Sequence, residues 1–140
     1  MQELITFVSH HLGLSLAVGI IVLLLIVIEL IRAKRNSFNI TPAQTIHLIN
    51  HEQAAIIDIR PRELFNKGHI IDAYSMTREE LLNHPKKLEK FKNKPIIMVC
   101  QAGIESQKIA ASLLKHGYNV YSLSGGIRAW TQAEMPLIKE

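Results

Sequence analysis

"PIIMVCQAGIESQKIAASLLKHG", residues 95–117, is the stretch that decides the fold. Pro95 sets a boundary, and the apolar run after it predicts a short buried strand that ends at Cys100. Beyond a short loop, apolar residues return at helical spacing on one face, and Gly117 is a natural helix end. A strand that passes through a tight loop into a helix is typical of α/β proteins.

Cys100, the chain's single cysteine, lies where a nucleophile is expected. It stands at the carboxyl end of the predicted strand, beside a loop that opens a helix. Free backbone N–H groups at such a place favour a thiolate, and later any anion that the sulfur carries. The alternative is a small apolar core residue, because free cysteines are among the most buried residue types. The position favours a reactive thiol.

The rest of the C-terminal part alternates between predicted strands and helices. Thr41 and Pro42 open a helix as N-cap and first residue, and Thr77 with Glu80 forms a capping box for another. We predict strands at residues 54–59, 73–76 and 119–126, and further helices at 85–91 and 127–135. The alternation predicts a mainly parallel sheet, in which ligands bind beyond the carboxyl ends of the strands.

The segment "LGLSLAVGIIVLLLIVIELI", residues 12–31, predicts a transmembrane helix. Twenty residues at about 1.5 Å each span about 30 Å, the thickness of a hydrocarbon core. A cleaved signal peptide is disfavoured because no Lys or Arg precedes the apolar run. A buried core helix is disfavoured because the segment is apolar all round. We therefore expect a membrane anchor and a lipid bilayer as partner.

Charge around this segment predicts its orientation. "RAKR" follows the span at once, so the positive-inside rule places the N-terminus outside and the main domain in the cytoplasm. We expect a single-pass protein of the inner membrane. Its predicted parts are an extracytoplasmic N-terminus (1–11), the helix (12–31), a basic juxtamembrane linker (32–38) and an α/β domain (39–140).

Composition excludes several other classes of function. One cysteine rules out an internal disulfide and a Cys-rich zinc site, and no Cys/His spacing suggests a metal, so we predict no metal or cofactor. The formal charge of +4 is scattered and aromatic residues make up only 6% of the chain, whereas a nucleic-acid site needs a basic stripe or stacking aromatics. We expect no nucleic-acid partner.

Three strings carry a resemblance to a known family: "IIDIRPRELFNKGHI" from residue 56, "PIIMVCQAGIESQKIAASLLKHGYNVYSLSGGIRAW" from residue 95, and "PL" at residue 136. With them the chain resembles the rhodanese-like sulfurtransferases, specifically single-domain members with an N-terminal membrane anchor. The resemblance covers most of residues 39–140. It implies a three-layer α/β domain with a mainly parallel sheet, preceded by one transmembrane helix.

The resemblance also implies a mechanism. The Cys100 thiolate attacks the sulfane sulfur of a donor, thiosulfate or a thiol or protein persulfide, and a nucleophilic acceptor then takes the sulfur. The acceptor is a thiol, a cyanide-like anion or a partner protein. The loop after Cys100 stabilises thiolate and persulfide through its amide N–H groups. The predicted substrate-binding residues are Gln101, Ala102, Gly103, Ile104, Glu105 and Ser106.

Other family positions are read as supporting ones. Asp58 and Arg60 match the family's Asp-x-Arg and are interpreted mainly as an ion pair or loop support, with contact to substrate as the alternative. His69 is expected to pack and hydrogen-bond, with a role as general base as the alternative. Ser106 either donates its hydroxyl to the site or caps the helix. Trp130, in the closing "GG…AW" pattern, is expected to pack on the core.

Glu105 departs from the family pattern, in which this position often carries a cationic or neutral group. A carboxylate that faces the site repels an anionic donor such as thiosulfate, whereas one that points into solvent is screened by salt. The residues after His69 also depart, since Ile71, Asp72 and Ala73 replace the common Pro-Gly-Ala. Because of Glu105, we expect thiosulfate to be a poor donor.

Two alternative functions remain. A phosphatase of this fold needs an arginine six residues after the cysteine to clamp phosphate, but that position holds Ser106. A membrane-tethered interaction module that keeps the fold without efficient turnover is favoured by Glu105 and disfavoured by the retained Cys100 and Gly103.

Overall fold

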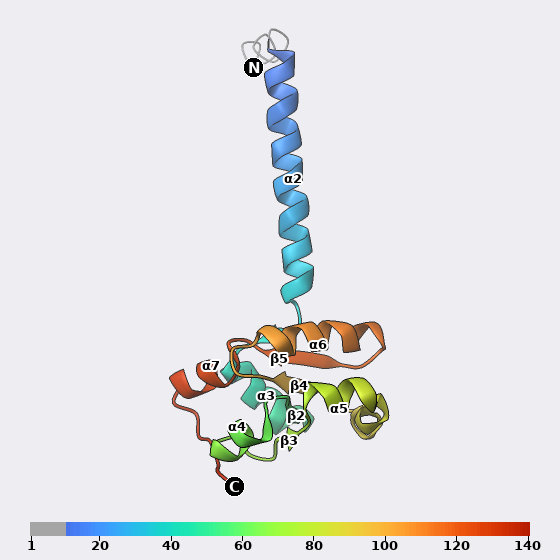
Figure 1. Cartoon of the computed structure of the whole chain (residues 1–140). Helices are drawn as coiled ribbons and strands as arrows, with labels where there is room; N and C mark the ends of the chain where they lie inside the picture. The colour runs from blue at the N-terminus through green and yellow to red at the C-terminus, as the bar shows by residue number, and fades with distance from the viewer. Residues whose placement is uncertain (1–10) are drawn as a thin grey trace. The chain divides into compact units, whose positions relative to one another are not determined.

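The computed structural model describes residues 11–140, and the side chains of residues 34–36 are outside that description. The chain divides into two units, with the boundary between Ser37 and Phe38 (Figure 1). The predicted extracytoplasmic N-terminus lies outside the described residues, except for His11.

In its described residues, 11–37, the first unit contains one helix, α2 (Leu12–Asn36). Its segment Leu12–Ala33 is long and apolar enough to cross a membrane, with a mean hydropathy of 3.1 over its most apolar window, and none of that window is buried. The exposure of this window disfavours a core helix of a soluble protein, which is mostly buried. A signal sequence is also long and apolar enough to meet this criterion. The helix continues past residue 31 because Arg, Ala and Lys are good helix formers.

The second unit contains a five-stranded sheet in the order β1-β5-β4-β2-β3. The paired strands are parallel throughout. This confirms the prediction of an α/β domain on a parallel sheet. The strands are β1 (Asn39–Ile40), β2 (Ala55–Asp58), β3 (Tyr74–Ser75), β4 (Ile96–Val99) and β5 (Val120–Leu123).

Helices follow the strands in alternation. α5 begins with the predicted capping box of Thr77 and Glu80, and α3 begins at the predicted N-cap, Thr41, where Gln44 completes a capping box that was not predicted. The hydrogen bond from the Thr77 N–H and the Lys87 ammonium lower the pKa of the Glu80 carboxyl. The helical segments are α3 (Pro42–Glu52), α4 (Arg62–Lys67), α5 (Arg78–Asn83), the 3-10 helix η1 (Pro85–Phe91), α6 (Ile104–Lys115) and α7 (Gly126–Gln132).

The sheet carries a hydrophobic core on each face. Successive side chains of a strand point to opposite faces, so Ile96 and Met98 belong to the core under α5, η1 and α6, while Ile97 and Val99 belong to the core that includes Trp130 of α7. Both faces of β4 are buried, which explains its continuous apolar sequence. Three layers result.

Two elements are additional to those predicted from sequence. β1 lies at the edge of the sheet, where Ser122 donates its N–H to Phe38 O. It is only two residues long and polar at Asn39, so it gives no periodic signal. α4 begins after Pro61 and lasts six residues, which is too short to show a helical repeat.

Candidate active site

Cys100 lies where β4 ends and the loop to α6 begins. The loop is short because Gly103, at the N-cap of α6, has φ +87, a left-handed conformation that disfavours side chains. A Cβ at Gly103 would also lie 2.8 Å from Gly125 N. The loop thus folds tightly against the next strand–helix turn.

The side chain of Cys100 lies inside this loop, and 5% of the residue's surface is exposed to solvent. Its Sγ accepts the backbone N–H of Gly103 at 3.1 Å and that of Ser106 at 3.4 Å. As a thiol it also donates to Ser106 Oγ at 3.3 Å. Two amide donors directed at one sulfur are placed to stabilise negative charge that develops on it in a reaction.

Ser106 connects the sulfur to the sheet. It is fully buried, and its Oγ donates to Gly103 O at 3.2 Å and lies 2.9 Å from Ser122 Oγ of β5. The Ser106 hydroxyl therefore lies next to the sulfur as an acceptor, and α6 has no side-chain cap hydrogen bond at its N-cap, Gly103. Ser122 gave no signal in the sequence because the contact crosses 16 positions.

Gly126 supports the loop from the other side. Ile127 donates its N–H to Cys100 O at 3.0 Å, and Arg128 donates to Gln101 O at 3.2 Å, so the start of α7 holds the backbone of the loop. A Cβ at Gly126 would lie 2.2 Å from Cys100 O. This close approach of two backbones requires a glycine at 126, whereas a Cβ at Gly125 would lie 2.6 Å from the Cβ of Ala129.

Asp58 and Arg60 form a buried ion pair at the end of β2. The Arg60 guanidinium donates to Asp58 Oδ2 at 2.7 Å and to the carbonyl of Gly68 at 2.7 Å. Its Nη1 is 3.4 Å from Gln101 Oε1, which brings the pair to the edge of the loop. The arrangement is that of a support for two loops, because both charged groups are almost fully buried.

His69 is 2% exposed and stacks on the ring of Phe65, with centroids 3.8 Å apart. Its Nδ1 is 2.9 Å from Phe65 O, and its backbone exchanges two hydrogen bonds with Ile138. These contacts tie α4 to the C-terminal segment. They match a packing role and not that of a base.

The rim of the loop is exposed to solvent. Gln101, Ile104 and Glu105 are exposed, and Ala102 is half-buried. Ile104 has 62% of its surface exposed, which is unusual for a large apolar side chain beside a candidate site.

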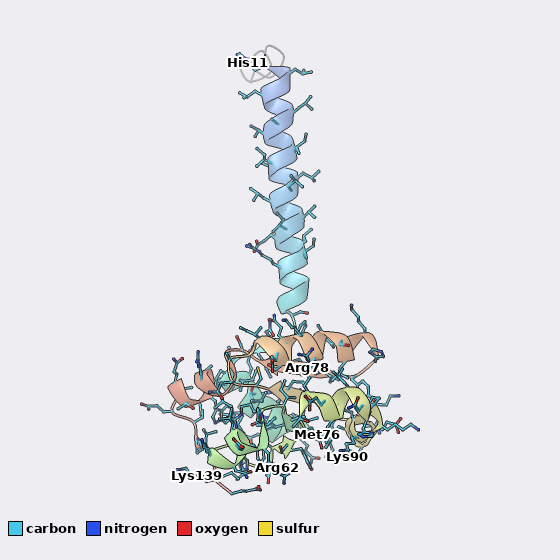
Figure 2. All side chains as sticks on the ribbon, viewed as in Figure 1. His11, Arg62, Met76, Arg78, Lys90 and Lys139 are labelled. Atoms are coloured by element: carbon cyan, nitrogen blue, oxygen red, sulfur yellow. The ribbon has the colours of Figure 1, made fainter. Side chains whose placement is uncertain are left out.

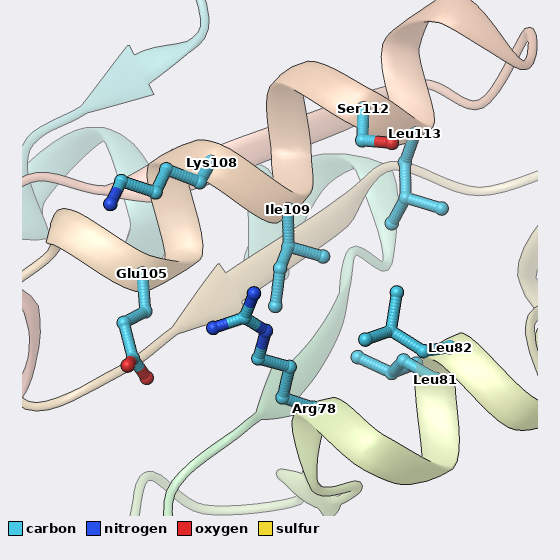
Figure 3. A pocket seen from close by; sticks show the side chains of 8 residues that line it. All are labelled: Arg78, Leu81, Leu82, Glu105, Lys108, Ile109, Ser112 and Leu113. Atoms are coloured by element: carbon cyan, nitrogen blue, oxygen red, sulfur yellow. The ribbon is translucent and has the colours of Figure 1, made fainter.

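A groove of about 280 Å³ lies between α5 and α6 beside this rim. Figure 3 shows Arg78 of α5 and Glu105 of α6 projecting toward the space between the two helices, which Leu81 of α5 and Ile109 of α6 also line. The Glu105 carboxylate therefore faces a groove that also holds cationic groups, Arg78 and Lys108. Arg78 was not among the residues singled out from sequence, because its proximity to the loop depends on how α5 packs.

Among residues 11–140, His, Cys, Asp and Glu form no cluster of three or more suited to a metal ion. The donors around Cys100 are amides and hydroxyls, which suit an anion on sulfur.

Comparison with known proteins agrees with this geometry. The rhodanese-like domain family model matches residues 41–133. The chain belongs to the rhodanese-like domain family. Among solved structures, a rhodanese-related protein from Thermoplasma volcanium has the same fold, with a TM-score of 0.67 at 24% identity over 73% of this chain and 98% of that one.

Two relatives differ in how much of this chain they match. An uncharacterised protein of Escherichia coli K12, YibN, is 34% identical over 99% of both chains. The thiosulfate sulfurtransferase GlpE of Shewanella oneidensis is 35% identical over 64% of this chain and 88% of its own length. The match to YibN includes the apolar helix of this chain, whereas the match to GlpE covers a stretch about as long as the α/β domain.

Proposed function

We propose that the protein is a membrane-anchored sulfurtransferase or persulfide carrier with Cys100 as its nucleophile. The observation that carries the proposal is the pair of backbone N–H groups, from Gly103 and Ser106, directed at Cys100 Sγ. Membership of the rhodanese-like family and the similarity to GlpE proteins support the same chemistry.

The reaction has two steps. The Cys100 thiolate attacks the outer sulfur of the donor, a new S–S bond forms, and the donor's own sulfur–sulfur bond breaks. The leaving group, sulfite from thiosulfate or a thiolate from a persulfide, takes the electron pair. A nucleophilic acceptor then attacks the terminal sulfur of the persulfide and returns Cys100 to the thiolate.

The loop after Cys100 stabilises both the thiolate and the persulfide of this residue. The amides of Gly103 and Ser106 stabilise the thiolate, and the Ser106 hydroxyl supplies a third hydrogen bond when it turns toward the sulfur. Gln101, Ala102, Ile104 and Glu105 form the entrance past which the substrate passes. Asp58 and Arg60 hold the loop in place through Gln101.

Glu105 shapes the choice of donor. Its exposed carboxylate disfavours a doubly charged anion such as thiosulfate, although Arg78 and Lys108 line the same groove. A persulfide on a small thiol or on a partner protein carries less charge at its sulfur and is the favoured donor.

The apolar helix is proposed to anchor the protein in the inner membrane. The absence of Lys and Arg before the span and the "RAKR" after it support an outside N-terminus and a domain in the cytoplasm. A reducing compartment suits a single working thiol.

The second candidate is a tethered interaction module with weak turnover. The exposed Ile104 and the acidic Glu105 at the rim favour it, because both are suited to contact with a protein. It retains the fold and the anchor and differs only in what Cys100 does.

Intact mass of the full chain in detergent, after incubation with thiosulfate or with glutathione persulfide, tests the proposal. We expect a gain of one sulfur, about 32 Da, that a reductant removes and that depends on the thiolate nucleophile. Cys100→Ser is the matched control, because it is nearly isosteric and keeps the loop's hydrogen bonds.

The outcomes separate the two candidates. A gain in the wild-type chain that is absent in Cys100→Ser supports sulfur transfer and identifies the donor. If neither donor loads the wild-type chain, the tethered module replaces the enzyme as the better account.

A further inference from the structure

The groove between α5 and α6 begins beside the candidate nucleophile. Glu105, which lines the groove, directly precedes Ser106, and the backbone nitrogen of Ser106 lies 3.4 Å from Cys100 Sγ. The residues of α6 that line the groove continue to Leu113. Because a helix rises about 1.5 Å per residue, the groove extends about 12 Å along α6 from Glu105 to Leu113. A molecule that reacts at Cys100 can therefore occupy the groove at the same time.

The two ends of the groove differ in chemistry. Figure 3 shows Glu105 and Lys108 toward the start of α6, and Leu82 and Leu113 toward the other end, with Arg78 between them. Leu82 is 68% exposed and Leu113 is half-buried, so the apolar end is open to a ligand. Exposed apolar side chains that line a groove indicate an interaction site.

The charged groups of the groove are not neutralised within the chain. Arg78, which Figure 2 labels, is exposed at the start of α5. No ion pair in the part of the chain that the structure describes includes Arg78, Glu105 or Lys108. An extended peptide complements both signs of charge, because each residue offers an N–H donor to a carboxylate and a C=O acceptor to a cation.

The size of the groove limits what it can hold. Pockets for whole small-molecule ligands have volumes of about 300–1,000 Å³, whereas this groove measures about 280 Å³. It suits one large side chain with the backbone beside it. An extended chain advances about 3.3 Å per residue, so a side chain three residues from the reacting sulfur lies about 10 Å away from it, near the apolar end. Neither thiosulfate nor glutathione has a large apolar group for that end.

We propose that the groove binds an extended segment of a partner protein that exchanges sulfur with Cys100. A large apolar side chain of this segment, three residues from the partner's reactive cysteine, lies between Leu82 and Leu113. The Cys100 thiolate attacks the outer sulfur of the persulfide on that cysteine, which leaves as a thiolate. A second copy of this chain does not fit, because its single cysteine is buried. The inference rests on the proposed sulfur transfer and assigns it a protein donor.

Disulfide exchange between the full chain in detergent and short peptides tests the proposal. The peptides are acetyl-Cys-Ser-Ser-Leu-amide, its counterpart with Ala in place of Leu, and the same pair in reversed order, which covers both chain directions. Each is supplied as its disulfide with mercaptoethanol, in an excess of free mercaptoethanol. The Cys100 thiolate attacks the peptide's sulfur and mercaptoethanol leaves, so the new disulfide holds the peptide where a donor would lie. Intact mass measures the conjugated fraction at equilibrium.

We expect the Leu peptide of one order to form its conjugate with an equilibrium constant about fivefold or more above that of its Ala counterpart, because the apolar end buries the larger side chain. Leu82→Gln should lower this ratio to less than about two, because the apolar contact is lost. Leu114→Gln is the matched control and should keep the ratio, since Leu114 is also an exposed leucine but does not line the groove. Unfolding in denaturant, followed by the fluorescence of Trp130, verifies that both variants are folded.

Equal conjugation of the Leu and Ala peptides in both orders overturns the proposal and leaves a small thiol as the better donor. A ratio that Leu114→Gln lowers as much as Leu82→Gln does also overturns it, because binding then lies outside the groove. A chain that conjugates neither peptide nor mercaptoethanol overturns it together with the reactive thiol. Failure of sulfur loading from glutathione persulfide on the same preparation concerns the proposed function alone, because disulfide exchange does not require sulfur transfer.

Discussion

Ser106 touches the candidate nucleophile with both its amide and its hydroxyl, and the hydroxyl also reaches Ser122. Ser106→Ala removes one hydrogen bond to the sulfur anion and keeps the amide. Because hydrogen bonds to charged groups contribute about 1.5–3 kcal/mol, we expect sulfur loading to slow by about tenfold or more. Stopped reactions followed by intact mass measure the rate.

Ser122→Ala is the control for this prediction. It breaks the same 2.9 Å bond between the two hydroxyls but leaves Ser106 beside the sulfur. Both variants should lose about 1 kcal/mol of stability, whereas only Ser106→Ala should lose most of its loading rate. Equal loss of rate in both would reduce Ser106 to a structural residue.

Glu105 sets the charge at the entrance. Glu105→Gln removes a negative charge near the path of an anionic donor, so we expect loading by thiosulfate to rise about two- to fivefold at low salt. The gain should shrink at 0.5 M NaCl because exposed charges are screened. Loading by glutathione persulfide should change less.

Glu79→Gln serves as the matched variant, since Glu79 is also exposed in the first turn of a helix but does not line the groove. An equal rise in thiosulfate loading for Glu79→Gln would mean that net charge, and not the place of Glu105, governs the donor.

At the scale of elements, the turn from β5 to α7 fixes the loop that follows β4. Gly126→Ala places a methyl group 2.2 Å from Cys100 O at a positive φ of 59°. We expect a loss of at least about 3 kcal/mol in the free energy of unfolding, because two backbones must separate. Fluorescence of Trp130, the chain's single tryptophan, follows unfolding in denaturant.

Gly117→Ala separates strain from crowding. Gly117 has a positive φ of 84°, but nothing lies within 4 Å of its added Cβ. Its cost should be about 1–2 kcal/mol, from backbone conformation alone. Similar losses of unfolding free energy for Gly126→Ala and Gly117→Ala would contradict the close contact between Gly126 and the backbone of Cys100.

The elements differ in how far sequence predicts them. β4, α3 and α5 carry local signals, an apolar run or a capping box, and they occur where predicted. β1 and α4 lack such signals because two and six residues are too few to show a period. η1 is predicted as a helix and is of the 3-10 type, with seven residues, which is long for a 3-10 helix.

For the whole molecule, the proposed orientation is the first property to test. Protease added to spheroplasts should leave the domain intact, and protease added to inverted inner-membrane vesicles should degrade it. The expectation follows from the positive charges placed only after the span. Replacing Arg32, Lys34 and Arg35 with Gln should give mixed orientation.

Degradation of the domain in spheroplasts would contradict the proposed orientation and place Cys100 in an oxidising compartment. Loss of residues 1–36 from the mature protein, read by intact mass, would identify the helix as a cleaved signal.

Sequence alone determined the apolar helix, the alternation of strands and helices, the caps at Thr41 and Thr77, and the position of Cys100 at a strand end. Short stretches of sequence are enough to predict these features, because the spacing of apolar residues, helix capping and turn preferences depend on residues that are close together in the sequence.

Tertiary structure decided which groups meet at the sulfur. Ser106 reaches Ser122 across 16 positions, Arg60 approaches Gln101 across 41, and Gly126 lies against the backbone of Cys100. The register of parallel strands and the packing of helices on them create these contacts. Such distances in sequence leave no local pattern, so only the folded chain specifies them.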